Sequence, residues 1–239
     1  MPSEDSFTEI IEKNLWSDPD WAPYARGEAP LPDRPFSGRL VAKYLFYLGK
    51  DNKAREVCEM VARSTEKKFS RREPSVGAYS RGFDAALYYD LARNEARARS
   101  IWSRIADGVE DLEPEQIFKQ KKANVWVYQA YALTKLGEHE QVKEPAQRGR
   151  NAIENGKGTH KAPHRNSREF ALGPLLVKLA DYKIHNESAI RQEAQQALIE
   201  YKQENVLYGR LGYLVIFDLQ FSYPDVFDPV LPGEDPEKD

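Results

Sequence analysis

Hydrophobic residues recur along this chain with a long period. Four short phrases are alike, since each has a leucine followed by a small residue, and their leucines stand 43, 45 and 43 residues apart. The phrases are Tyr47-Leu48-Gly49, Asp90-Leu91-Ala92, Lys135-Leu136-Gly137 and Lys178-Leu179-Ala180. Self-similarity at a period of this size is typical of proteins built from repeated supersecondary units. The pattern therefore predicts four similar units.

The residues before each leucine predict a helix with one closely packed face. Hydrophobic or aromatic residues mostly stand three and four positions before the leucine, which are offsets that share a helical face. The position six before the leucine is small in every unit: Ala42, Ala85, Ala130 and Gly173. A small residue lets a neighbouring helix approach closely. We expect the first helix of each unit to end at its leucine, where a small residue suits a helix stop.

A second amphipathic run follows each stop and predicts the other helix of a pair. In the first unit its apolar positions are Ala54, Val57, Cys58, Val61 and Ala62. In the third unit Pro145 is compatible only with a first helical turn, so that helix should begin near Glu144. Residues 207–221 are the most apolar stretch of the chain and predict a closing helix that is buried on most sides.

The units resemble tetratricopeptide repeats over about residues 38–205. In the third unit the residues that match the columns of this family are Trp126, Ala130, Leu133, Leu136 and Gly137. In the first unit they are Ala42, Leu45, Leu48, Gly49 and Ala54. The resemblance implies an all-α fold, a right-handed stack of about four antiparallel helix hairpins plus a closing C-terminal helix. It also implies that the first helices of the units line a concave groove.

The predicted stack occupies residues 38–222 and is flanked by two different segments. Residues 1–37 should form a short helix that ends near Trp16 and a proline-rich strap, which we define as residues 17–36. Trp21, Tyr24 and Phe36 are costly to leave in water, so we expect the strap to pack against the first unit. Residues 223–239 form an acidic, proline-rich tail.

Composition narrows the class of protein. With 41% hydrophobic and 31% charged residues the chain is globular, and its net charge of −3 gives no overall attraction to nucleic acid or anionic lipid. The single cysteine, Cys58, excludes an intrachain disulfide and lies in an apolar stripe, where a buried small side chain is expected. No signal peptide or membrane span is evident. We therefore expect a cytoplasmic protein that does not enter a membrane.

Motifs of catalysis and metal binding are missing from the sequence. Nucleophile elbows, zinc-protease motifs and dinucleotide fingerprints do not occur. His160 and His164 are four residues apart, but Pro163 between them predicts a solvated loop and not a helical metal site. We expect no enzyme activity, no cofactor and no metal.

The leading functional hypothesis is an interaction module, either an adaptor or a cognate inhibitor of the immunity or antitoxin type. Tyrosines supply contact area at little entropic cost and are enriched in binding surfaces. Several fall in the first helices of the units, where they would line a groove for a protein or peptide partner. The expected groove residues are Tyr44, Tyr47, Tyr89, Tyr128 and Tyr131. The oligomeric state is left open.

The alternative hypothesis is binding of nucleic acid or another polyanion. Basic residues cluster in the connections between one unit and the next, which lie on one edge of such a stack. The residues of this basic edge are Arg71, Arg72, Lys157, Lys161, Arg165 and Arg168. An ordinary solvated edge explains the same pattern, because cations are favoured at helix C-termini.

Overall fold

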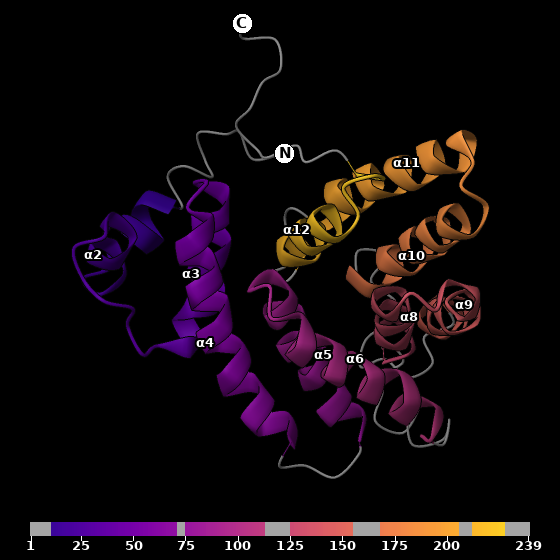
Figure 1. Cartoon of the computed structure of the whole chain (residues 1–239), viewed down its shortest axis with the longest axis horizontal. Helices are drawn as coiled ribbons and strands as arrows, with labels where there is room; N and C mark the ends of the chain where they lie inside the picture. Colours follow the sequence, from indigo (N-terminus) through magenta and orange to yellow (C-terminus); the bar gives the residue numbers. More distant parts are fainter. Residues whose placement is uncertain (1–10, 71–74, 113–124, 155–167, 206–211, 228–239) are drawn as a thin grey trace, which may run out of the picture.

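The computed structural model describes residues 11–70, 75–112, 125–154, 168–205 and 212–227 (Figure 1). Every regular element in these ranges is a helix, which confirms the all-α class. The α-helices are α2 (Trp21–Arg26), α3 (Pro35–Tyr47), α4 (Asp51–Ser70), α5 (Val76–Leu91), α6 (Glu95–Glu110), α8 (Val125–Leu136), α9 (Lys143–Glu154), α10 (Arg168–His185), α11 (Ser188–Asn205) and α12 (Gly212–Ser222). The π-helix η1 (Glu12–Trp16) and the 3-10 helix η2 (His139–Gln141) complete the set.

Helices that are neighbours in the chain pack against each other. From α3 to α11, each α-helix contacts the next one along the chain. Four pairs joined by short connections result, namely α3 with α4, α5 with α6, α8 with α9, and α10 with α11. In Figure 1 these pairs follow one another around an arc, from the indigo end of the chain to the orange one.

The ends of the first helices follow the predicted leucines in three pairs out of four. Leu48 follows α3 directly, and Leu91 and Leu136 are the last residues of α5 and α8. In the fourth pair the prediction is wrong, because α10 continues through Leu179 to His185. Alanine allows a helix to continue, so the end of the helix depends on where the left-handed residue stands: Arg93 follows Leu91 by two positions, whereas Asn186 follows Leu179 by seven.

The turn within each pair places one residue in the left-handed backbone region. Gly49 has φ 65°, Gly137 has φ 85° and Asn186 has φ 54°. In the second pair this residue is Arg93, with φ 60°. Glycine adopts such a conformation at no steric cost, whereas a residue with a Cβ atom loses about 1 kcal/mol there.

The predicted close-packed column is buried. Ala42, Ala85 and Ala130 have no exposed surface, and Gly173 is also buried. Cys58 lies in the core, as its apolar stripe predicts. Helix α9 begins at Lys143 with Pro145 in its first turn, which confirms the predicted start.

The strap contains a short helix and packs against the first pair. Trp21 and Tyr24 on α2 are buried, and the Tyr24 hydroxyl donates to the Glu56 carboxylate on α4 at 2.8 Å. These contacts confirm the predicted docking. Phe36 departs from it, because this residue is in the first turn of α3 and leaves 79% of its surface exposed.

Helix α12 lies inside the arc and contacts several helices (Figure 1). Its residues Leu214–Gln220 are buried all round, which confirms the predicted burial. The rings of Phe217 and Phe221 lie 5.4 and 5.8 Å from the ring of Phe46 on α3, between centroids. Helix α12 also packs against α5 and α11. It therefore does more than close the last pair, because a helix that is apolar on every side requires neighbours on every side.

Candidate functional site

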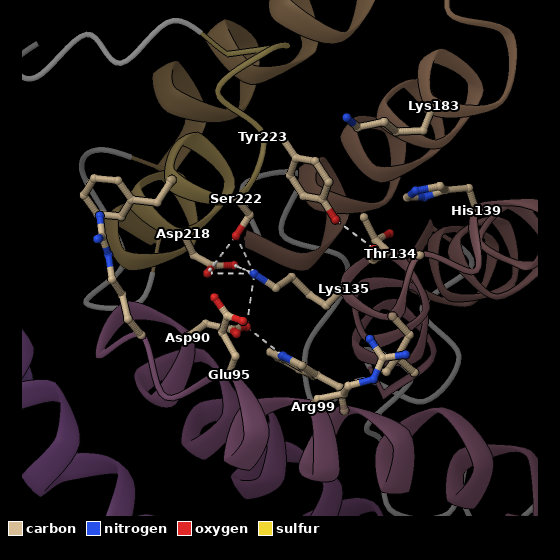
Figure 2. A pocket seen from close by; sticks show the side chains of 15 residues that line it. Asp90, Glu95, Arg99, Thr134, Lys135, His139, Lys183, Asp218, Ser222 and Tyr223 are labelled. Atoms are coloured by element: carbon tan, nitrogen blue, oxygen red, sulfur yellow. Dashed lines mark hydrogen bonds and ion pairs between the residues drawn. The ribbon is translucent and has the colours of Figure 1, made fainter.

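A cavity of about 710 Å³ opens where the C-terminal ends of α5 and α8 meet α12 (Figure 2). We call it the charged pocket, because ionisable side chains of both signs line it. Its floor holds Asp90, Lys135 and Asp218, while Arg93, Glu95 and Arg99 expose their side chains at its rim. The floor thus draws on three helices that are distant in sequence, and α6 supplies Glu95 and Arg99 of the rim.

Lys135 is the centre of the floor. Its ammonium donates to Asp218 Oδ1 at 2.9 Å and to Ser222 Oγ at 2.6 Å, and it lies 3.1 Å from Asp90 Oδ2. The Lys135 side chain is 8% exposed and that of Asp218 is 2% exposed. Two carboxylates therefore share one largely buried ammonium.

Two aromatic residues complete the hydrogen bonds of this cluster. The indole nitrogen of Trp102 donates to Asp90 Oδ2 at 2.7 Å. The Tyr131 hydroxyl donates to Asp218 Oδ2. Buried carboxylates are stable only when their oxygens are paired in this way. The network consequently joins α5, α6, α8 and α12.

Two of these residues occupy equivalent positions in the period of the sequence. Asp90 and Lys135 stand immediately before the leucines Leu91 and Leu136, so they occupy equivalent positions in adjacent pairs. Side chains at equivalent positions of adjacent units in a repeat meet because the units stack. Opposite charges at one position of consecutive helix pairs are therefore a sequence signal from which this contact could have been predicted. Asp218 comes from outside the repeats and had no comparable signal.

Burial and charge change the protonation of the floor. Burial and the nearby Asp218 charge raise the pKa of Asp90 to about 7, despite the opposing effects of Lys135 and Trp102. Burial by itself lowers the pKa of Lys135, but Asp218 and Asp90 raise it more, so its pKa lies above the ordinary value. Lys135 is therefore a cation at neutral pH.

The contact between Ser222 and Lys135 has the composition of a serine–lysine nucleophile. A lysine can act as the base for a serine only when its amine is neutral. The two carboxylates keep Lys135 charged, so it cannot accept the proton of Ser222. The ion pairs of Lys135 with Asp90 and Asp218 tie α12 to α5 and α8.

The rim offers groups that the chain itself leaves unpaired. Within the described part of the structure, the side chains of Arg93 and Arg99 make no hydrogen bond or ion pair. His139 Nδ1 is buried without a partner, and burial together with the Lys183 charge lowers the pKa of this imidazole. Lys183 pairs with Asp225 at 2.7 Å. Figure 2 shows Arg99, His139 and Lys183 around the mouth of the cavity.

The tyrosines predicted to line a groove lie mostly inside the molecule. Tyr44, Tyr89, Tyr128 and Tyr131 are buried, and Tyr47 is half-buried. Tyr89 donates to Glu66 on α4 at 2.6 Å, Tyr128 stacks on Phe83 at 4.4 Å between centroids, and Tyr131 donates to Asp218. Neighbouring helices, including α12, cover the faces on which these residues stand. Four of the five are thus packing residues here and form no open surface.

The predicted basic edge falls where the structure gives no side chains. Arg71, Arg72, Lys157, Lys161 and Arg165 lie outside the described residues, as do His160 and His164. Arg168 begins α10, but its side chain is not described. The basic edge therefore stays a prediction.

The described residues contain neither a metal-binding group of side chains nor a helix that could span a membrane. Among the described residues no group of three or more His, Cys, Asp or Glu side chains is arranged to hold a metal ion. None of the described helices combines the length and the apolar character that crossing a bilayer requires.

No protein-family model, curated protein or solved structure matches this chain.

Proposed function

We propose that this chain is a non-enzymatic interaction module, either an adaptor or a cognate inhibitor of the immunity type, which binds a protein partner at the charged pocket. The observation that carries the proposal is the pocket itself, in which exposed and unpaired charges stand over a buried, self-satisfied ion network. Charged rims of this kind give specificity and fast association in protein complexes. The four helix pairs fit a tetratricopeptide-like, right-handed stack, and the buried cysteine fits the cytoplasm.

The position of α12 favours binding of a partner at the charged pocket over binding inside the arc of helices. A partner that entered between the first helices would have to displace Phe217 and Phe221 from Phe46, and Asp218 from Lys135. Those contacts are buried, so their loss would cost far more than a surface association returns. At the pocket, by contrast, Arg93, Glu95 and Arg99 are accessible without any rearrangement.

The chemistry of the floor also favours binding over catalysis. The most reactive arrangement in the pocket is Ser222 beside Lys135, and the charge on Lys135 removes its capacity as a base. Its buried residues therefore serve as a rigid support for the exposed ones. A rigid support is what a recognition site requires, because it lowers the entropic cost of binding.

The test is capture of a partner by the full chain and by two charge-reversal variants. Arg99→Glu changes the pocket rim, while Lys67→Glu changes an exposed position of α4 that does not line this pocket. Captured proteins are identified by mass spectrometry, purified and titrated against each variant. A partner that binds the Lys67→Glu variant normally and the Arg99→Glu variant at least about tenfold more weakly supports the proposal. Equal binding to both variants would show that the partner uses another surface.

A further inference from the structure

Arg93 occupies a backbone position that two other turns fill with glycine. The same hydrogen bond closes three of the turns: Lys50 N to Leu45 O at 2.8 Å, Asn94 N to Tyr89 O at 2.8 Å, and Glu138 N to Leu133 O at 2.9 Å. The left-handed residue of these turns is Gly49, Arg93 and Gly137 respectively. This is the helix-ending motif in which glycine is the usual residue. An arginine there is unfavourable for the fold.

No interaction of the Arg93 side chain within the described residues compensates for its left-handed backbone conformation. Its side chain is exposed and makes no hydrogen bond or ion pair there. A cation near a helix C-terminus is favoured by the helix dipole, but Gly49 and Gly137 show that the same turn forms without one. Strained residues that the fold does not require concentrate at functional sites.

The surroundings of Arg93 define the ligand that it suits. Arg93 and Arg99 line the charged pocket, and Glu95 is the only acidic residue among the exposed side chains of its described lining. Lys183 and Asp225 neutralise each other at the edge. Two unpaired guanidinium groups thus outnumber the one exposed carboxylate, and the unpartnered Nδ1 of His139 lies in the same cavity. Guanidinium groups bind carboxylates through two parallel hydrogen bonds.

We propose that Arg93 and Arg99 each bind an acidic side chain, aspartate or glutamate, of the partner segment that enters the charged pocket. This inference rests on the proposed function and names the chemistry of the partner. Arg93 is then a specificity residue that is kept at a cost to the fold. A cavity of about 710 Å³ has room for a few residues of a peptide.

A short acidic peptide fits the pocket better than a nucleic acid does. The floor carries Asp90 and Asp218 against the single Lys135, and Glu95 stands at the rim. A peptide can bring a carboxylate to each arginine and keep neutral groups over the floor. A phosphate backbone would bring a row of negative charges next to the three acidic residues, where like charges repel.

The experiment compares two glycine substitutions at corresponding turns. Arg93→Gly removes the side chain and the strain together, whereas Asn186→Gly relieves a left-handed residue that does not line the pocket. Thermal unfolding midpoints are measured for both. The probe is a blocked hexapeptide with two adjacent glutamates, titrated by calorimetry at low salt beside the same peptide with glutamines.

Both variants should unfold at a higher temperature than the natural chain. The glutamate peptide should bind the natural chain and the Asn186→Gly variant with equal affinity. It should bind the Arg93→Gly and Arg99→Gln variants at least about tenfold more weakly. Unchanged peptide affinity in the Arg93→Gly variant would overturn the inference, as would equal binding of the glutamine peptide or tighter binding of a single-stranded oligonucleotide.

Failure of this inference can be distinguished from failure of the proposed function. If the glutamate peptide does not bind but a captured protein still depends on Arg99, the pocket is an interaction site for another chemistry. If no captured protein depends on Arg99, the proposed function fails as well.

Discussion

Lys135 on α8 and Asp218 on α12 are 83 residues apart in the sequence, and their Nζ and Oδ1 atoms lie 2.9 Å apart in the structure. Asp90 on α5 approaches the same ammonium. This contact fixes the last described helix against two helices from the middle of the chain. The stability of the fold and the shape of the pocket floor are therefore set by the same three residues.

Replacement of Lys135 by methionine should destabilise the protein by about 3–5 kcal/mol, because it leaves two buried carboxylates without a cation. Lys178→Met is the matched control, since Lys178 holds the equivalent position in the fourth pair and forms an exposed ion pair with Glu193. That control should cost less than about 1 kcal/mol. Urea unfolding measures both, and equal effects would contradict a special role for Lys135.

The stability of the protein should depend on the protonation of Asp90. Its pKa is about 7 in the folded protein, against an ordinary value of 3.8. Between about pH 4 and pH 7 the folded state therefore holds a proton that the unfolded chain has lost. Stability from this group is complete below about pH 4 and decreases as the pH rises to about 7. Asp90→Asn should remove this decrease. Urea unfolding at several pH values would therefore show the variant gaining stability relative to the natural chain from pH 4 to 7, and a constant difference would contradict the assignment.

Truncation of two phenylalanines should have very different effects on stability. Phe217→Ala removes a buried ring that packs on Phe46 and should cost about 3–5 kcal/mol. Phe36→Ala removes a ring that is 79% exposed and should change stability by less than about 0.5 kcal/mol. Chemical denaturation of the two variants tests whether α12 packs as described. A small effect of Phe217→Ala would show that α12 contributes little to the core.

Enlargement of a small residue in the close-packed column should also destabilise the fold. Ala130 has no exposed surface, so Ala130→Leu should overpack the contact and cost about 1–3 kcal/mol. Ala96 on α6 is exposed, and Ala96→Leu serves as the control with little effect. If the two variants have the same denaturation midpoint, the small-residue column is not a packing requirement.

The sequence predicted the elements well because helix periodicity and stop signals are local. Leu91 and Leu136 end their helices, and Pro145 stands in the first turn of α9, as expected. Where the local signal was weak the prediction failed. Ala180 does not stop α10, and Phe36 remains exposed although the strap is docked.

The site was harder to predict because it depends on where α12 lies. The tyrosines were expected in an open groove on the assumption that the first helices face solvent. Helix α12 covers part of that region, and Tyr131 binds Asp218 in consequence. Periodicity assigns a residue to a face of its helix, but it does not state what covers that face. The pairing of Asp90 with Lys135 could have been found from the repeat, whereas Asp218 could not.

The position of α12 has a consequence for how the molecule comes apart. In a stack whose units touch only their neighbours, unfolding can proceed unit by unit from the ends. Here one helix contacts α3, α5, α8 and α11, so detaching it exposes apolar surface on several pairs at once. Partial unfolding that detaches α12 therefore loses all of these contacts at once. The chain should therefore lose its helices in a single cooperative transition, with the calorimetric and van't Hoff enthalpies equal.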